Sequence, residues 1–567
     1  MILTKIPVKK KNDVYLVITD AFREDGKVKR RSVKSLGYLS KLKEQYDDPI
    51  AYFTEVARQM TEEKKLTGGI RTIKIDFSNK STSENCLFNC GSMFIKKAFD
   101  SLKLDYIFRK YKDKSKIKAN LAGIFEFLTI NQIIDPSSKL SSFYKKDMYL
   151  KKYNFDLDEI YRSLSYINKI DKEIQSQIYK NSFNLCERDA SKLYYDCTNY
   201  YFEIEVEDEF RKFGFSKEHR PNPIVQMGMF IDGSGIPVGY DLFSGNKNEQ
   251  LSMIPIEKEI LKTYKTSKVV VCADAGLCSG NNKIFNSFAD KNYIFVQSLK
   301  KVKSYINDEI FDENNDKWVK INENLKYYSR NINDKVSTTL FSNGTMMVNH
   351  EAKLIITFDQ DFFDYMKMVR QKRIEKALKI IENPNSFTKE TSKDGKQYIK
   401  TINYDGNGEI IEKKLELDFE KIHEEEKYDG YYALITSLVD ENPMNIIGIN
   451  KQRWSIEDCF RTLKTDLKAR PVFLSSEDRI RTHFLIAYTS LVLLKLIQKL
   501  LRKSISEEDS TMPKILYALR NFSIVKIENS IYKNCGTNEI IQELCKIFNV
   551  KLDNDFIKGD YLKSFLK

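Results

Sequence analysis

The segment from Lys192 to Leu299 constrains the fold most, because its pattern alternates between strands and helices. Three strand-like stretches come first: KLYYDCTNYYFEIE, IVQMGMFI and IPVGYDLF, the last two joined by the turn DGSG. A helical stretch from about residue 249 to 264 follows, and then the apolar stretches KVVVCADAG and YIFVQSL, with another helix between them. This order predicts an α/β sheet with helices packed on it.

Two aspartates stand out in these strands. Asp196 interrupts the first strand, and Asp274 stands at the C-terminal end of the most apolar one. A polar side chain in such a strand is costly without a partner, and open α/β sheets bind ligands outside the strand ends. Taken singly, Asp196 can be a satisfied buried carboxylate and Asp274 a helix N-cap. Three antiparallel strands followed by alternating helices and strands is the order of a ribonuclease-H-like fold.

The stretch NKQRWSIEDCFRTLK, from Asn450 to Lys464, predicts a helix. At 3.6 residues per turn, Ile456, Phe460 and Leu463 fall on one face, as packing on a core requires. A second stripe carries one carboxylate among three cations: Arg453, Glu457, Arg461 and Lys464. Surface ion pairs of about 0.2–0.5 kcal/mol each explain such a stripe by themselves. The two strand aspartates favour a charged site instead.

If folding gathers Asp196, Asp274 and Glu457, their ligands are all hard oxygens, which favours Mg²⁺ or Mn²⁺ over zinc. Two such ions about 4 Å apart would catalyse phosphodiester displacement. Arg453 and Lys464 would hold the phosphates beside the scissile one. Trp454 is either a core anchor or a stacking surface for an unpaired base.

Composition favours a polyanionic partner without proving one. Lys and Arg number 93 against 80 Asp and Glu, a formal charge of +13. Nine scattered cysteines without paired CxxC spacing predict reduced thiols in a cytoplasmic protein and argue against zinc. The most apolar run, Leu485 to Leu494, is too short to span a bilayer, so we expect a buried helix and no membrane partner.

Two basic elements are candidates for DNA contact. Residues 14–39 predict a β-hairpin around the turn EDGK, and its second strand is rich in Lys and Arg. That strand lies along a phosphate backbone or is a charged, solvated edge. A long helix at about 361–382 carries Arg370 and Arg373 among several lysines, and it is either a DNA contact or a solvated face.

Several segments together resemble the bacterial insertion-sequence transposases of the DDE class. These are SKLYYDCTNYYFE, GFSKEHRP, DGSGIPVGY, FSGN, VVVCADAG and RWSIEDCFRTLK. The resemblance is to the branch that has a β-rich insertion before the catalytic glutamate. It implies that Asp196, Asp274 and Glu457 are the metal-binding triad, and that Arg453 and Lys464 are the arginine and lysine of the Y-R-E-K signature. Asn450 stands at the tyrosine position of that signature.

The resemblance also implies a division of labour. We expect an N-terminal hairpin and helix region (1–80), a helical DNA-binding region (81–188), the first part of a ribonuclease-H-like core (189–299), a mixed β-rich insertion (300–444), the second part of the core with the catalytic helix (445–500) and a helical C-terminal region (501–567). The first two would bind the terminal inverted repeats, and the core would cut and join DNA with two Mg²⁺ or Mn²⁺ ions. The insertion would clamp DNA, and Asn450, Trp454, Arg461, Arg370 and Arg373 would add DNA contacts.

The implied reaction is cut-and-paste transposition by a homodimer that holds transposon ends and target DNA, in the bacterial cytoplasm at the nucleoid. Whether a hairpin intermediate forms is left open by the residues. Two other functions stay possible at this point: a metal-dependent nuclease or resolvase on the same fold, and a catalytically idle DNA-binding derivative. The three acids in this order argue against the idle derivative.

Overall fold

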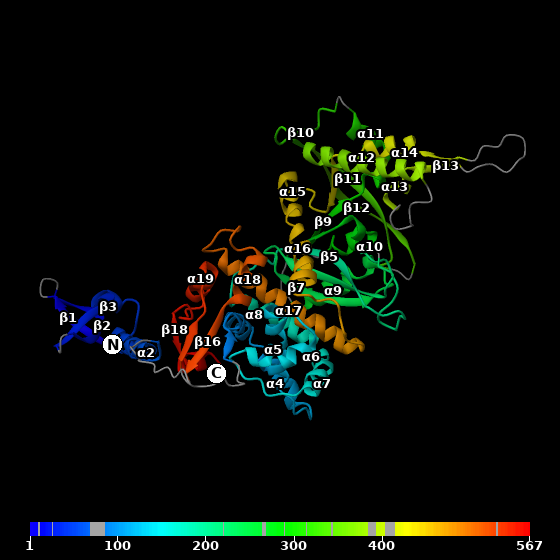
Figure 1. Ribbon diagram of the computed structural model, residues 1–567. Coiled ribbons are helices and arrows are strands. Elements are labelled where there is room, and N and C mark those ends of the chain that lie inside the picture. The colour runs from blue at the N-terminus through cyan, green and yellow to red at the C-terminus, as the bar shows by residue number, and fades with distance from the viewer. Residues whose placement is uncertain are drawn as a thin grey trace, which may run out of the picture. The chain divides into compact units, whose positions relative to one another are not determined.

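The computed structural model describes residues 1–8, 12–24, 27–67, 86–218, 220–263, 268–288, 290–312, 315–341, 344–383, 393–402, 414–528 and 531–566 (Figure 1). The chain forms two compact units. The first contains residues 1–101, 117–163 and 497–567, and the second contains residues 102–116 and 164–496. The helical region expected at 81–188 therefore contributes to both units.

A small sheet with one main helix opens the first unit. Its strands β1 (Ile2–Val8), β2 (Asp13–Glu24) and β3 (Lys27–Tyr38) pair antiparallel in the order β1-β2-β3. The structure thus adds β1 to the expected hairpin, while the turn residues 25–26 lie outside the described part of the chain. The short helix α1 (Leu39–Leu42) and the longer α2 (Pro49–Thr67) follow. Asp48 caps α2, because its Oδ1 accepts the amides of Ile50 and Ala51, each at 3.0 Å.

Helices follow from residue 92 to residue 182. They are α3 (Ser92–Ser101), α4 (Asp105–Asp113), α5 (Leu121–Ile134), α6 (Lys139–Tyr144), α7 (Leu157–Asn168) and α8 (Asp171–Ser182). The segment DPSSK, residues 135–139, separates α5 from α6, and the Ser138 hydroxyl caps α6 by accepting the amide of Ser141.

The C-terminal region is not all helical, and the prediction is wrong there. Its helices α18 (Met512–Asn521), α19 (Glu539–Ile547) and α20 (Gly559–Leu566) accompany a four-stranded antiparallel sheet. The strand order is β18-β17-β16-β4, formed by β18 (Phe556–Lys558), β17 (Ile531–Asn534), β16 (Ser523–Glu528) and β4 (Leu87–Asn89). These strands are very short, and β4 is more than 400 residues from β16, so periodicity within one stretch does not show the pairing.

A nine-stranded mixed sheet is the centre of the second unit. Five of its strands come from the segment with strand–helix alternation: β5 (Lys192–Tyr201), β6 (Ile224–Asp232), β7 (Pro237–Ser244), β8 (Val269–Ala273) and β9 (Lys291–Gln297). They lie in the order β7-β6-β5-β8-β9. The strands β5, β6 and β7 pair antiparallel, whereas β8 runs parallel to both β5 and β9.

Alternate residues of β5 face opposite layers. Leu193, Tyr195 and Cys197 belong to a core cluster that includes Met253 and Ile256 of α9 (Met253–Thr263). Tyr200, on the other face, packs its ring against Phe484 of α17 (Glu477–Leu501), with ring centroids 4.6 Å apart. The helix α10 (Gly280–Phe285) joins β8 to β9.

The segment from 300 to 444 extends this same sheet. Its strands β10 (Val319–Lys320), β11 (Leu325–Thr338), β12 (Met346–Asp359) and β15 (Tyr431–Thr436) continue the order as β10-β11-β12-β15-β9. Beyond the sheet lie α11 (Ser304–Phe311), α12 (Gln360–Glu382), α13 (Lys393–Lys396) and α14 (Phe419–Glu426), with the pair β13 (Ile399–Ile402) and β14 (Lys414–Leu417). The insertion is therefore continuous with the central sheet through β15.

After β15 the chain returns through two short helices, α15 (Pro443–Lys451) and α16 (Trp454–Arg461), and a π-helical turn, Thr462–Asp466. The sequence predicts one helix over Asn450–Lys464, but the structure breaks it at Gln452 and Arg453. Ile456, Phe460 and Leu463 are buried, as expected for the apolar face. The helix α17 is long and apolar enough to cross a membrane, yet 89% of its apolar window is buried inside the protein, as the sequence predicts for its Leu485–Leu494 run.

Candidate active site

Asp196 and Asp274 occupy matching positions on neighbouring parallel strands. The register pairs Tyr195 of β5 with Ala273 of β8, so an aspartate follows on each strand. The backbone of Asp274 stays extended, and its Oδ1 accepts the amide of Ala275 at 2.7 Å as a cap. Because adjacent strands lie about 4.8 Å apart and matched residues share a face, the two carboxylates leave the sheet side by side.

The environment of Asp196 disfavours its charge. Burial raises the pKa of Asp196 to about 6, and the nearby Asp274 charge acts in the same direction. Lys217 and Arg453 lower the pKa and partly offset this effect. The Lys217 ammonium also lies 3.7 Å from Glu249. Asp196 is therefore a carboxylate that gains from a further cation nearby.

Tyr194 holds the turn that leads into α16, the helix that carries Glu457. Since it precedes Asp196 by two residues on β5, its side chain leaves the same face. Its hydroxyl donates to the carbonyl of Ile449 at 3.0 Å and lies 3.2 Å from Oε1 of Gln452. These bonds hold the turn between α15 and α16, and Glu457 lies in the first turn of α16.

Arg453 joins two of the three carboxylates. Its Nη1 lies 3.9 Å from Oδ2 of Asp274 and 3.6 Å from Oε1 of Glu457. The Arg453 side chain is 17% exposed, whereas Asp274 and Glu457 are 51% and 61% exposed. Burial opposes its charge, but Asp274 and Glu457 raise the pKa of Arg453 above its usual value. The structure thus brings the three acids to one site, with a guanidinium between two of them.

The donor types fit a hard divalent cation, because every candidate ligand is a carboxylate oxygen. Among the described residues, however, no three Asp, Glu, His or Cys side chains are close enough to coordinate one ion as they stand. Arg453 lies between two of the candidate ligands. The three acids are therefore candidate ligands of a suitable type, but in this structure they do not surround one ion position.

Two buried polar atoms beside the triad are unsatisfied. Oδ1 of Asn450 and Nε of Arg453 are buried and have no hydrogen-bond partner in the part of the chain that the structure describes. A buried donor or acceptor without a partner costs about 1–3 kcal/mol. Such atoms in a native protein call for a specific explanation.

The other residues of the Asn450–Lys464 segment differ in their surroundings. Trp454 is 60% exposed, so it is not a core anchor. The Arg461 guanidinium contacts Asp458 on its own helix and is largely exposed. Lys464 is 15% exposed and lies 3.3 Å from Glu218. Asn450, Arg453 and Trp454 thus lie at the α15–α16 turn, and Lys464 is paired with a different acid.

The arginines expected to contact DNA from the insertion lie elsewhere. Arg370 is buried and pairs with Asp429 at 2.5 Å and Glu426 at 3.4 Å, so this contact holds α12 to the end of α14. Arg373 is half-buried and bonds to Tyr398. Arg370 is thus not available as a DNA contact, contrary to the expectation. The exposed cations of α12 are Lys367, Lys372 and Lys379.

Three residues of the site are missing from the sequence prediction: Tyr194, Lys217 and Glu218. Tyr194 is one of several tyrosines in β5, and its partner Ile449 is 255 residues away. Lys217 and Glu218 belong to the GFSKEHRP motif, which resembles the family's but carries no assigned role. Glu218 accepts from both Lys464 and Arg470, which lower its pKa although burial raises it.

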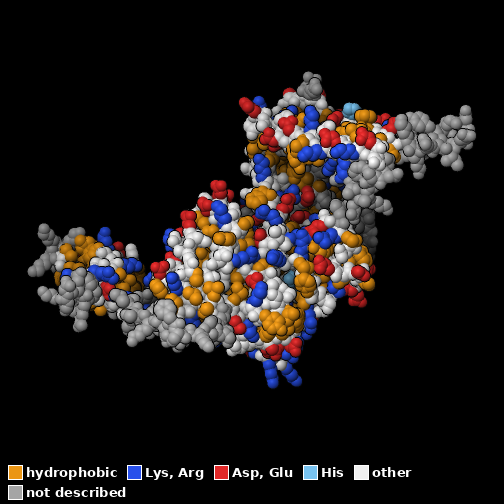
Figure 2. Space-filling view, in the orientation of Figure 1, with side chains coloured by type: hydrophobic (Ala, Val, Ile, Leu, Met, Phe, Trp, Pro, Cys, Tyr) orange, Lys and Arg blue, Asp and Glu red, His pale blue; other side chains and the backbone are white. Residues whose placement is uncertain are grey.

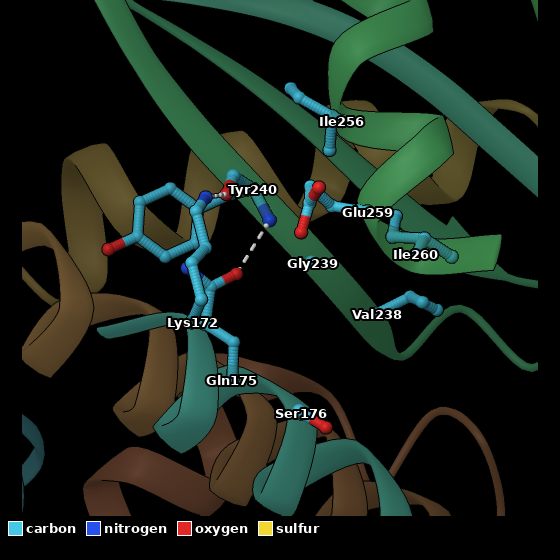
Figure 3. Close-up of a pocket in the computed structure, with 9 residues that line it drawn as sticks. All are labelled: Lys172, Gln175, Ser176, Val238, Gly239, Tyr240, Ile256, Glu259 and Ile260. Carbon is cyan, nitrogen blue, oxygen red and sulfur yellow. Dashed lines mark hydrogen bonds between the residues drawn. The ribbon is translucent and has the colours of Figure 1, made fainter. Parts of the chain in front are cut away.

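A small pocket in the same unit contains none of the predicted site residues. It lies between α8, β7 and α9, and Lys172, Gln175, Gly239 and Tyr240 are among its lining (Figure 3). Gln175 accepts the Tyr240 amide at 3.0 Å, and Lys172 donates to the Tyr240 carbonyl at 3.3 Å (Figure 3). These polar groups satisfy one another, which indicates helix–sheet packing.

Comparison with known proteins identifies two family models. Residues 3–67 match the N-terminal domain of IS1634 family transposases, and residues 202–493 match the transposase DDE domain. Asp274 and Glu457 lie inside the second match, and Asp196 lies just before it. The comparison with curated proteins finds no similar sequence.

Among solved structures, the chain is similar to the piggyBac transposase in a synaptic complex with hairpin DNA, determined by cryo-electron microscopy. The TM-score is 0.34 and the identity 8%, over 76% of this chain and 79% of that one. The DDE match covers more than half of the 567 residues, with an IS1634-type domain before it. The chain therefore belongs to the bacterial insertion-sequence DDE transposases and is a DNA transposase, an enzyme that cleaves DNA and transfers strands.

Proposed function

We propose that Asp196, Asp274 and Glu457 form the catalytic centre of this transposase on a ribonuclease-H-like core. The strand order β7-β6-β5-β8-β9 supports the fold, because it places three antiparallel strands beside two parallel ones. The two aspartates then lie on the first and fourth core strands in chain order. The observation that carries the proposal is their matched register on β5 and β8, with Arg453 linking Asp274 to Glu457.

We propose that the triad holds two Mg²⁺ or Mn²⁺ ions, as carboxylate ligands favour. Bound there, such ions activate an attacking oxygen and stabilise the departing one. The chain's own residues position the DNA. When DNA binds, the Arg453 guanidinium leaves Asp274 and Glu457 and binds a phosphate, whose oxygens match its planar pair of N–H donors. This exchange also frees the two carboxylates to bind metal. The unsatisfied atoms of Asn450 and Arg453 support a site that the substrate completes.

Trp454 and Lys464 take secondary roles in this proposal. The exposed indole of Trp454 offers a stacking surface for a base that has left the duplex. Lys464 can bind a phosphate only if its ammonium leaves Glu218. Arg470 also pairs with Glu218 and would still neutralise that carboxylate. Arg461 is exposed on the next turn of α16 and needs only to leave Asp458.

We assign end recognition to the N-terminal region, with the helices of residues 81–188, and a DNA clamp to the insertion. The exposed lysines of α12 support the clamp. Two paired ends call for a homodimer that works at the nucleoid in the cytoplasm. The proposed reaction is cut-and-paste transposition. Cleavage of duplexes that carry the transposon ends would also show whether a hairpin intermediate forms.

The test is cleavage of duplexes that carry the inverted repeats flanking the gene, with Mg²⁺ present. Asp196→Asn, Asp274→Asn and Glu457→Gln should each lose at least about 10³-fold in cleavage rate and keep end binding. Glu205→Gln, an exposed carboxylate outside the site, is the matched control and should keep full activity. Full cleavage by any triad variant removes that residue from the centre. Precleaved ends should join a second duplex, which a simple nuclease does not do.

A further inference from the structure

We propose that Arg220 binds one phosphate of the DNA strand that passes beside the catalytic centre. This inference rests on the proposed function, because it needs the bond that is cut to lie at the triad. Arg220 belongs to the GFSKEHRP motif, which lies outside both the triad and the Asn450–Lys464 segment. The argument from charge, orientation and position follows from its contacts.

Arg220 differs from the other arginines near the triad in having no acidic partner. Lys and Arg side chains are spread among Asp and Glu over much of the visible surface, so overall charge does not locate a DNA contact (Figure 2). Pairing is more informative, because each of the other arginines near the triad contacts a carboxylate: Arg453, Arg461 and Arg470. Arg220 is exposed and makes no ion pair with any residue that the structure describes. Its charge is therefore available to an anion without the loss of an existing ion pair.

An aromatic ring orients the Arg220 guanidinium. Its Cζ lies 4.3 Å from the ring centroid of Tyr201, the last residue of β5. Such a contact is worth about 0.5–1 kcal/mol at an exposed site. Stacking uses the flat face of the guanidinium and leaves the N–H donors at its edge free to bind. Arg220 is therefore partly ordered before DNA arrives, which reduces the entropy lost on binding a phosphate.

Tyr201 also connects Arg220 to residues that contact the catalytic segment. Cζ of Arg470 lies 5.3 Å from the same ring, and Arg470 pairs with Glu218, which also accepts from Lys464. We call Arg220, Arg470, Lys464 and Glu218 the Tyr201 cluster. It contains three cations and one carboxylate, a net charge of +2. The charge of the cluster is thus complementary to a polyanion, and Arg220 is its unpaired member.

The Tyr201 cluster lies along the strand that carries Asp196. Nζ of Lys464 lies 5.6 Å from the ring centroid of Tyr200, which shares a face of β5 with Asp196 because four residues separate them. At about 3.3 Å per residue, Tyr200 and Tyr201 are about 13 and 17 Å from Asp196 along the strand. Each DNA strand carries one charge per about 3.4 Å of helix axis. A phosphate within about five base pairs of the cut can therefore reach Arg220.

The experiment measures binding of the full-length protein to a duplex that carries the terminal inverted repeat, over a range of salt concentrations and without divalent ions. Arg220→Gln should reduce the slope of log affinity against log salt by about one and weaken binding about eightfold at about 0.1 M salt. Arg220→Lys keeps the charge and should restore most of that slope. The matched control is Lys262→Gln, an exposed cation of α9 on the other side of the sheet, which should bind as the wild type does.

Two further measurements locate the contact. With Mg²⁺ and saturating DNA, Arg220→Gln should cleave within about twofold of the wild-type rate, because Arg220 binds the substrate away from the reacting phosphate. A neutral methylphosphonate is then placed at one backbone position at a time. One position within about five base pairs of the cut should weaken binding by the wild type and by Lys262→Gln but not by Arg220→Gln, because that variant has already lost the contact.

Three results overturn the proposal. The first is an unchanged affinity and salt slope in Arg220→Gln, and the second is an equal loss in Lys262→Gln, which shows a diffuse charge effect. The third is a scan in which every methylphosphonate acts equally on the wild type and on Arg220→Gln. Weaker binding accompanied by lower thermal stability, and not restored by Arg220→Lys, also overturns it, because it assigns Arg220 a structural role. Failure of the proposed function gives a different result, namely full cleavage by the triad variants.

Discussion

Replacing Arg453 by glutamine removes the cation that lies between Asp274 and Glu457. In the DNA-free protein, any ion that binds these carboxylates has to displace the guanidinium, whose Nη1 lies 3.9 and 3.6 Å from them. Arg453→Gln should therefore strengthen divalent-ion binding while it weakens DNA cleavage. The two effects have opposite signs because the same side chain competes with the metal and holds the phosphate.

The size of the metal effect follows from exposure. Both carboxylates are more than half exposed, so each contact with Arg453 is worth about 0.2–1 kcal/mol. Loss of both contacts should release about 0.4–2 kcal/mol, which corresponds to roughly 2- to 30-fold tighter binding.

Titration of the full-length, DNA-free protein with Mn²⁺, followed by electron paramagnetic resonance, measures this change. Arg461→Gln is the matched control, because it removes a guanidinium from the same helix whose partner is Asp458. Its Mn²⁺ affinity should stay within about twofold of the wild type. Weaker or unchanged Mn²⁺ binding by Arg453→Gln would refute the view that Arg453 competes with the ion.

Three further predictions concern the turn that holds α16 and the stability of the second unit. Tyr194→Phe removes the hydroxyl that donates to the Ile449 carbonyl, so chemical denaturation should show a loss of about 1–3 kcal/mol in unfolding free energy. The rate of DNA cleavage should fall about 10- to 100-fold because α16 shifts, and an unchanged rate would contradict this role. Arg188→Met leaves the fully buried Asp232 carboxylate unpaired and should cost about 3–5 kcal/mol of unfolding free energy, with a much smaller loss contradicting the pairing. Burial raises the pKa of Glu257 to about 7, so the folded protein favours the protonated carboxyl. The stability that this protonated carboxyl adds to the folded state is fully present below about pH 4.5 and is lost as pH rises through 7. Glu257→Gln should remove that decline in thermal stability, and an identical pH profile would refute it.

The sequence predicts those parts of the site that depend on local pattern. Asp196 and Asp274 are recognisable because each is a charge in an apolar strand, and Ile456, Phe460 and Leu463 show the buried face of the Glu457 helix. The break before Trp454 is not visible, because it depends on the bond from Tyr194 to a distant carbonyl.

Charge patterns alone mislead where the partner is far along the chain. Arg370 reads as one cation of a basic helix, but its acids, Glu426 and Asp429, lie more than 50 residues later and bury it. Lys464 is likewise paired with Glu218, which belongs to a loop far upstream. In both cases the charge pattern along the sequence does not reveal which cations are already neutralised.

The insertion begins after β9 and returns as β15, which pairs with β9 itself. Excising residues 300–444 would consequently strip β9 of one hydrogen-bonded neighbour and turn it into a bare edge. Exposed edges of this kind invite association with other chains, so a shortened enzyme should precipitate before its DNA preferences can be compared. Engineering a minimal version of this protein would have to retain β15, or replace it with another capping strand.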